Sequence, residues 1–590
     1  MREPLQPSPP AQPCRTAGPR FAVLRILLGL ALCGFPAAAQ SPVVPDEPAA
    51  EEEFFGVVDV EVVNIDVWVT DRQGNPVEGL ERDDFIVLRD GEPVEVTNFY
   101  AVADGRPATP APAPGAPPPE PAAVAAEPLE QEVPPEHRLW LVVYLDSYNI
   151  DPIERKRVIP ALQSFLSATL GPGDRAMIVS ATRHAEVRLP FTGHLPALFD
   201  TLDEIAKESG HAVVRRRELM ETLRLIDEAE SSSQALMPAR RYAEQVMNEV
   251  GYTVDALERL VESLAGLPGR KALIHVSSGV PMAAGEPAFH AVARKYETSE
   301  AYGEIPRYDM SREFERVSRQ ANAHRVVFYT LDAGGLRGME FGNAEYGGFV
   351  DMDLRTTLDS VVPENLQAPL RLMALETGGR AIVNRNDALP ALDEATQDFR
   401  SYYSLGIASG AADSTRYHRI EVRLRDGIPK RGLTLRHRSG YRSKSAEAKV
   451  REGLRAALLY DHQSNPLGLE LVLGEAERDP ETGSYVLPIQ LRLPLRDLVI
   501  LPTPSGKHEL RLMLFVGAVS ENGGHSAIEE VPIGLRLAAE HVEAARAESF
   551  VHSHRVRVGP GRQKVGIAVF DRFGRQTAYI IRGVHVGSRN

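Results

Sequence analysis

A run of seven apolar residues, Leu139–Leu145, constrains the fold more than any other segment, and Asp146 follows it directly. The run LWLVVYL has no polar alternation, which favours a central parallel strand covered on both faces. Open α/β sheets bind ligands beyond the carboxyl ends of their strands, so Asp146 is predicted to lie where a binding site would form. The alternative is that Asp146 only caps the helix that follows.

Strand and helix signals alternate over residues 137–400, as a parallel sheet with crossover helices requires. The predicted strands are Leu139–Leu145, Arg175–Ser180, Glu186–Leu189, Lys271–Val276, Arg325–Leu331 and Arg380–Val383. The predicted helices are Ile153–Leu170, Leu195–Lys207, Val213–Glu228, Ala239–Leu264, Ser311–Ala323 and Ala368–Thr377. Residues 281–310 combine Gly and Pro with weak periodicity, and we expect a loop insertion there.

The first 39 residues have the pattern of a secretory signal peptide, because an apolar stretch from Phe21 to Phe35 ends in Ala37-Ala38-Ala39. Cleavage there would leave Gln40 first. No later segment reaches the ~20 apolar residues that span a bilayer. We therefore expect an exported protein with no transmembrane segment after cleavage, which is periplasmic, secreted or on the cell surface. A lipoprotein anchor at Cys33 is a minor alternative, since Leu32 is bulky where a small residue is usual.

The length of 590 residues predicts several domains, and the formal net charge of −15 argues against sequence-independent nucleic-acid binding. Residues 40–53 are predicted to be disordered, residues 54–102 to form a small β unit, and residues 103–136 to form a Pro/Ala-rich linker. The β unit is too small to be stable alone, so we expect strands in 401–442 to pair with it. Residues 450–590 are predicted to form a C-terminal β-sandwich of immunoglobulin-like type.

Seven segments carry a resemblance to a known family. They are VTDRQGNPVEGLERDDFIVLRDGEPVEVTNF, VYLDSYN, GRKALIHVSSGVP, VVFYTLDAGGL, LETGGRAIVNRND, SYYSLGI and LRHRSGYR. In this order they resemble a von Willebrand factor A domain, and more closely the bacterial VWFA-related domain family described chiefly from Acidobacteria. The resemblance covers roughly residues 56–442. It implies a multidomain α/β plus all-β protein, in which a Rossmann-like domain with a mostly parallel central sheet and helices on both faces is flanked by β-sandwich modules.

The resemblance also implies a metal-ion-dependent adhesion site in degenerate form. Such domains commonly hold a divalent cation through a DxSxS loop, a threonine and a second aspartate. Asp146 matches the first aspartate, but Tyr148 and Ile150 stand where the serines would be, and Ser277-Ser278-Gly279 replaces Thr-Asp-Gly.

The oxygen donors that remain at this predicted site are Asp146, Ser147, Asn149 and Ser278. One carboxylate with neutral oxygens would hold Mg²⁺ or another divalent cation only weakly, unless a partner supplied a further carboxylate. In the alternative interpretation, Asp146 and Asn149 cap the helix near Pro152 or bind a loop backbone. Asp332 either lines the same edge or fixes the Gly334-Gly335 turn.

No motif in the sequence indicates an enzyme, since H-E-x-x-H, a phosphate-binding loop and G-x-S-x-G are all missing. His275 is predicted to be a core histidine, and His552 with His554 to form at most a weak metal pair. No cofactor is predicted beyond the weakly held cation.

We therefore expect a non-catalytic binding, adhesion or scaffold protein that contacts a protein or another macromolecule, not nucleic acid. The predicted contact edge consists of Asp146, Asn149, Ser278 and Asp332. The alternatives are a purely structural component of an envelope assembly and, as a third class, a hydrolase whose residues the sequence does not assemble.

Overall fold

The computed structural model describes residues 62–103, 105–107, 138–208, 210, 212–337, 351–409, 416–428, 432–480 and 483–587. The predicted signal peptide (1–39), the predicted disordered segment (40–53) and Cys33 lie outside these residues. The predicted linker (103–136) also lies outside them, except for its first residues. Among the described residues, no helix combines the length and the apolar character that crossing a bilayer requires.

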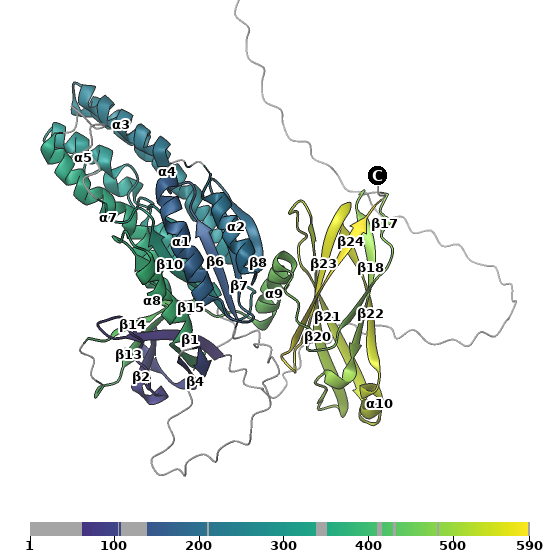
Figure 1. Cartoon of the computed structure of the whole chain (residues 1–590). Coiled ribbons are helices and arrows are strands. Elements are labelled where there is room, and N and C mark those ends of the chain that lie inside the picture. The colour runs from purple at the N-terminus through teal and green to yellow at the C-terminus, as the bar shows by residue number, and fades with distance from the viewer. Residues whose placement is uncertain are drawn as a thin grey trace, which may run out of the picture. The chain divides into compact units, whose positions relative to one another are not determined.

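A six-stranded sheet with the strand order β11-β10-β9-β6-β7-β8 forms the centre of the α/β domain (Figure 1). All seven residues of β6 are buried, in agreement with the apolar run. The other strands are parallel to their neighbours, except that β8 runs antiparallel to β7. The strand bounds are β6 Leu139–Leu145, β7 Arg175–Ala181, β8 Ala185–Thr192, β9 Arg270–Ser277, β10 Val326–Asp332 and β11 Ala381–Ile382.

Helices cover both faces of this sheet, because alternate residues of β6 point to opposite sides. Leu141 and Val143 join an apolar core with α1, α2 and α8, whereas Val142 and Tyr144 join a second core with α3 to α7. The helix bounds are α1 Pro152–Thr169, α2 Leu195–Ile205, α3 Ala212–Glu228, α4 Ser232–Ser263, α5 Glu286–Lys295, α6 Ser311–His324, α7 Met352–Thr377 and α8 Leu389–Arg400.

The expectation of a loop over residues 281–310 is wrong, since this segment contains α5 and the short 3-10 helix η3 (Ile305–Tyr308). The first turn of α5 holds Pro287, where a proline favours a helix start. The less buried residues Glu286, His290 and Arg294 are four positions apart and mark one face of α5, but the helix has only ten residues, and the Gly and Pro around its start indicated a loop. Gly285 precedes α5 at a φ of 74°, and a Cβ there would overlap Ala243.

Two predicted helix starts are too late, because each was placed after a proline. Pro238 lies inside α4 and Pro363 lies inside α7, so both helices begin well before the predicted Ala239 and Ala368. The helices α8 and α9 (Ala446–Tyr460) were not predicted.

Strands from both sides of the α/β domain form one β module. β1 lies between β12 and β14, and β13 pairs with β2, so residues 401–442 do pair with the N-terminal β unit. The two sheets, β14-β1-β12-β4-β5 and β15-β13-β2-β3, contribute to one apolar core. The bounds are η1 Arg82–Asp84, β1 Val62–Thr70, β2 Phe85–Arg89, β3 Glu92–Val94, β4 Val96–Ala103, β5 Arg106–Pro107, β12 Tyr402–Ala408, β13 Tyr417–Leu424, β14 Thr434–His437 and β15 Gly440–Arg442.

The C-terminal domain consists of two antiparallel sheets around a shared apolar core, and α9 packs on one of them. β23 and β24 form an antiparallel hairpin. The bounds are β16 Glu470–Leu473, β17 Glu477–Arg478, β18 Tyr485–Pro494, η6 Leu495–Asp497, β19 Leu501–Pro502, β20 Lys507–Ser520, β21 Glu529–Ala538, η7 Ala539–His541, α10 Val542–Arg546, β22 Ser549–Val558, β23 Gly561–Asp571 and β24 Thr577–Val586.

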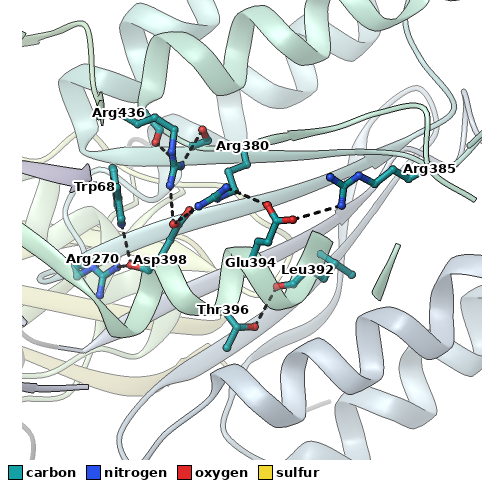
Figure 2. Close-up of polar contacts among 11 residues, drawn as sticks. Trp68, Arg270, Arg380, Arg385, Leu392, Glu394, Thr396, Asp398 and Arg436 are labelled. Carbon is teal, nitrogen blue, oxygen red and sulfur yellow. Dashed lines mark hydrogen bonds and ion pairs between the residues drawn. The ribbon is translucent and has the colours of Figure 1, made fainter. Parts of the chain in front are cut away.

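A buried carboxylate, Asp398 near the end of α8, joins the α/β domain to the β module (Figure 2). Arg380 donates to both of its oxygens, at 2.8 and 3.0 Å, and Arg436 of β14 donates to Oδ1 at 2.6 Å. The backbone carbonyl of Asp398 accepts hydrogen bonds from Trp68 of β1 at 2.8 Å and from Arg270 at 3.3 Å. Asp398 thus connects the central sheet of the α/β domain with strands β1 and β14 of the β module, and its hydrogen bonds with the three arginines are charge-assisted.

Candidate functional site

The loops that follow β6, β9 and β10 meet at one edge of the central sheet. Leu145 is in register with Val276, and Ser277 is in register with Asp332, so the residues after these strands are neighbours. We call the loops 146–151, 278–285 and 333–337 the carboxyl edge. The structure therefore brings the four predicted edge residues to one end of the sheet, as parallel strands require.

Asp146 is buried, and its carboxylate accepts hydrogen bonds from neutral groups. Asn149 Nδ2 donates to Oδ2 at 2.7 Å, Ser277 Oγ donates to the same oxygen at 3.0 Å, and the Asn149 backbone N–H donates to Oδ1 at 3.3 Å. The Nε2 atom of His275 lies 3.7 Å from Oδ2. Hydrogen bonds of this kind stabilise a buried charge without a cation in direct contact.

Arginines hold the other predicted donors of this loop. Arg215 of α3 donates to Asn149 Oδ1, and its guanidinium lies 5.6 Å from the ring centroid of Tyr148. Burial and the nearby Glu249 carboxylate raise the pKa of Tyr148 to about 12.

Ser147 is held in a similar way. Its Oγ lies 2.9 Å from Ser180 Oγ and 3.4 Å from Nη1 of Arg155. Arg155 is fully buried, and this burial lowers its pKa. The loop after β6 is thus fixed by two guanidinium groups that come from α1 and α3.

The Ser278 hydroxyl points away from Asp146, because it donates to the Glu154 carboxylate. The Ser278 carbonyl accepts a hydrogen bond from Arg337. Ser278 therefore belongs to the same edge as Asp146 but to a different set of contacts.

Asp332 has both of the roles that were considered for it. The Gly334 N–H donates to its Oδ1 at 2.9 Å and so fixes the following turn. Arg337 forms an ion pair with the same oxygen at 2.9 Å, and Gln367 donates to Oδ2 at 2.8 Å. Asp332 therefore both lines the carboxyl edge and stabilises its loop.

The helix-capping alternative does not describe Asp146 or Asn149. The N-cap of α1 is Asp151, whose side chain accepts a hydrogen bond from the Ile153 N–H at 2.8 Å. The second alternative, binding of a loop backbone, does apply, since Asp146 accepts the Asn149 N–H.

Of the predicted histidines, His275 lies in β9 beside Asp146, whereas His552 and His554 lie on β22 of the C-terminal domain. His275 is fully buried and packs against Tyr144 with ring centroids 5.2 Å apart, as expected of a core histidine, but neither of its ring nitrogens has a hydrogen-bond partner among the described residues. The rings of His552 and His554 stack at 6.3 Å, and burial lowers the pKa of His552. Within the described residues, no group of three or more His, Cys, Asp or Glu side chains is arranged to hold a metal ion.

The donor set at Asp146 does not fit a divalent cation. Both carboxylate oxygens accept hydrogen bonds, and the remaining oxygens of Ser147 and Asn149 face guanidinium groups. A Mg²⁺ ion needs six oxygens in near-octahedral geometry, and here the guanidinium groups of Arg155 and Arg215, the second of which pairs with Glu249 at 3.4 Å, already contact the Ser147 and Asn149 oxygens. The edge is therefore built as a network of protein donors rather than as an open coordination shell.

Sequence reasoning missed Arg155, Arg215, Arg337 and Glu154, which complete this network. Arg155 and Glu154 lie in the first turns of α1, close to the predicted loop, so their contacts with this loop could have been predicted from the sequence. Arg215 lies 66 residues from Asn149, so only the packing of α3 brings it to the edge.

No protein-family model matches the chain, and no curated protein matches it. Three similar solved structures share a TM-score of 0.21. They are the conserved hypothetical protein BatB from Bacteroides thetaiotaomicron (11% identity, covering 44% of this chain and 96% of that chain), a von Willebrand factor type A protein from Catenulispora acidiphila (10%, covering 76% and 66%) and the open form of the pilus adhesin SpaC from Lactobacillus rhamnosus GG (8%, covering 77% and 53%).

The similar structures thus include a von Willebrand factor type A protein, and this chain combines a mixed α/β domain with β domains.

Proposed function

We propose that this protein is an exported, non-catalytic binding or scaffold protein of von Willebrand factor A type, which captures a macromolecular partner at its carboxyl edge. Asp146, Asn149, Ser278 and Asp332 hold the edge in shape, and no metal ion is needed for capture. The net charge of −15 favours a protein or another ligand that is not a nucleic acid.

The observation that carries this proposal is a pair of exposed apolar side chains at the edge. Ile153, at the start of α1, is 79% exposed, and Leu336, in the loop after β10, is 61% exposed. Their two segments are linked by a hydrogen bond, which Arg157 of α1 donates to the Ala333 carbonyl. Each exposed aliphatic side chain would gain roughly 1.5–3 kcal/mol on full burial, so the edge favours a partner that covers it.

The C-terminal domain is proposed to be of immunoglobulin-like type. Two antiparallel sheets around one apolar core support this assignment. Such modules commonly bind or space other domains, although the fold alone does not decide between the two.

Site-specific photo-crosslinking in the cells that produce the protein tests the proposal. A photoreactive residue at Ile153 or Leu336 should give a discrete crosslinked species, and the same residue at Val551, which is 48% exposed in the C-terminal domain, should not. Ile153→Asp should abolish the species obtained through position 336. Equal labelling at all three positions would instead favour the purely structural envelope component.

Export is tested on the same cells. N-terminal sequencing of the mature protein from the extracytoplasmic fraction should begin at Gln40, and recovery of an uncleaved chain in the cytoplasm would contradict export.

A further inference from the structure

A strongly basic cavity of about 340 Å³ lies at the end of the central sheet opposite the carboxyl edge. Its walls come from the start of β9 and the end of α6 in the α/β domain, from β1 and residues 438–444 of the β module, and from α9. Six cationic side chains line it, together with one carboxylate, Glu452. The cations are Lys271, Arg325, Arg438, Arg442, Lys444 and Lys449. This excess stands out because the whole chain is acidic, with a formal charge of −15.

The single carboxylate of the cavity, Glu452, already has a cationic partner. Glu452 forms an ion pair with Lys444 at 2.8 Å, and the same ammonium group lies 2.7 Å from His324 Nδ1. Among the residues that the structure describes, no carboxylate forms an ion pair with Lys271, Arg325 or Arg438. Within the described part of the chain, these three cations of the cavity therefore have no ion-pair partner, and the opposing charges of Asp66 (for Arg438) and Glu452 (for Lys271) act only from beyond ion-pair distance.

Two of these three cations are also nearly removed from solvent, with Lys271 5% exposed and Arg438 8% exposed. Their hydrogen bonds go to backbone carbonyls, from Lys271 to Leu267 at 2.7 Å and from Arg438 to Asn322 and Asn64 at 2.9 and 2.8 Å. The Nε atom of Arg438 is buried and has no hydrogen-bond partner. Buried charges in proteins are normally paired, so this arrangement leaves room for an anion.

The pKa values of Lys271 and His324 also show that the cavity is strongly basic. Burial, with added repulsion from Arg325 and Lys444, lowers the pKa of Lys271 to about 7, and burial lowers the pKa of His324 to about 3. The cationic groups thus repel one another, and an anion between them would relieve that repulsion.

We propose that this cavity binds a small, doubly charged oxyanion of the sulfate or phosphate class, held by Lys271, Arg325 and Arg438, with Arg442 at its mouth. Guanidinium groups offer paired N–H donors that match the oxygens of such anions, and the ammonium group of Lys271 adds a point charge. The cavity is bounded by several parts of the chain, so the bound anion would stabilise the folded chain as a ligand does.

Isothermal titration calorimetry with sodium sulfate, at constant ionic strength set with sodium chloride, tests this proposal. Sulfate is the first probe, because it does not titrate near neutral pH, and inorganic phosphate is the second. We expect saturable binding of both anions. Arg442→Gln removes one exposed donor and should weaken binding about tenfold, since a hydrogen bond to a charged group is worth roughly that factor.

Lys271→Met should abolish saturable binding, and Arg496→Gln, which changes an exposed arginine of the C-terminal domain, should leave it unchanged. Sulfate also stabilises proteins in general, so this comparison matters more than a shift in melting temperature. If sulfate heats are absent from the unaltered protein, or are equal in all variants, the proposal is wrong. If Lys271→Met does not fold, the comparison of Arg442→Gln with the unaltered protein still tests the proposal.

The pH dependence gives a second readout. Lys271 faces Arg325, Arg438, Lys444 and Glu452, and its protonated form is the one that attracts an anion. Affinity for sulfate should therefore rise as the pH falls from 8 to 6. An affinity that does not change over this range would contradict the role of Lys271.

Discussion

Two buried aspartates lie at opposite ends of the same sheet, and they are neutralised in different ways. Asp398 forms direct ion pairs with Arg380 and Arg436, which belong to the α/β domain and the β module. Asp146 accepts hydrogen bonds from an amide and a hydroxyl, and Arg215 reaches it only through Asn149. Direct ion pairing thus serves to join two parts of the chain, whereas neutral donors fix the shape of a loop.

This difference predicts that the two carboxylates contribute unequally to stability. Loss of one partner from a buried ion pair leaves an uncompensated charge, which costs more than an unmade hydrogen bond between neutral groups.

Asp398→Ala should have the largest effect. It leaves two guanidinium groups without their shared carboxylate, so the free energy of unfolding should fall by about 3–5 kcal/mol. Urea unfolding followed by circular dichroism measures this fall. Asp393→Ala, an exposed position on the same helix, is the matched control and should change stability by less than about 0.5 kcal/mol. If Asp398→Ala and Asp393→Ala lower the free energy of unfolding by similar amounts, the ion pairs of Asp398 do not contribute the proposed stability.

Asp146→Ala should cost less, about 1–3 kcal/mol, because it leaves the donors of Asn149 and Ser277 without an acceptor. Asp146→Asn keeps an acceptor oxygen and should recover part of this loss. The same unfolding experiment decides the point. If Asp146→Ala lowers the free energy of unfolding by more than Asp398→Ala does, the proposed order of the two carboxylates is wrong.

Lys271→Met extends the comparison to a buried cation that forms no ion pair with a described residue and lies at the same end of the sheet as Asp398. The pKa of Lys271 is about 7 in the folded protein, below its ordinary value of 10.5, so between pH 7 and 10 the unfolded chain binds more protons. Stability of the unaltered protein should therefore rise with pH, by up to roughly 1 kcal/mol per pH unit relative to the variant. Unfolding of both proteins at pH 7 and 9.5 measures this. A difference that does not depend on pH would show that Lys271 titrates normally.

Ile153→Asp should have the smallest effect on stability, within about 0.5 kcal/mol, because the side chain is exposed. It should nevertheless abolish partner capture at the carboxyl edge. Thermal unfolding and photo-crosslinking through position 336 separate these two results. A variant that is stable and still crosslinks would contradict the proposed contact surface.

Local patterns predicted the parts of the fold that depend on neighbouring residues. The apolar run before Asp146 marked the central strand, and the weakness of the first β unit indicated its pairing with residues 401–442. The order of parallel strands placed Asp332 and Ser278 beside Asp146.

Local patterns could not predict contacts between segments that are distant in the sequence. Trp68 and Asp398 are 330 positions apart, and the guanidinium of Arg215 reaches Asn149 only after α3 has packed. The helix α5 escaped prediction for a different reason, because it has only ten residues and the Gly and Pro around its start are typical of a loop.

The measurement that tests the central claim most directly is a calorimetric titration of the protein from Gln40 onward with Mg²⁺ and Mn²⁺, beside Asp146→Ala. The carboxyl edge is proposed to be held by hydrogen bonds and arginines, so we expect no saturable heat in either protein. Saturable heat that disappears in Asp146→Ala would show that the edge holds a cation, and would contradict metal-independent capture.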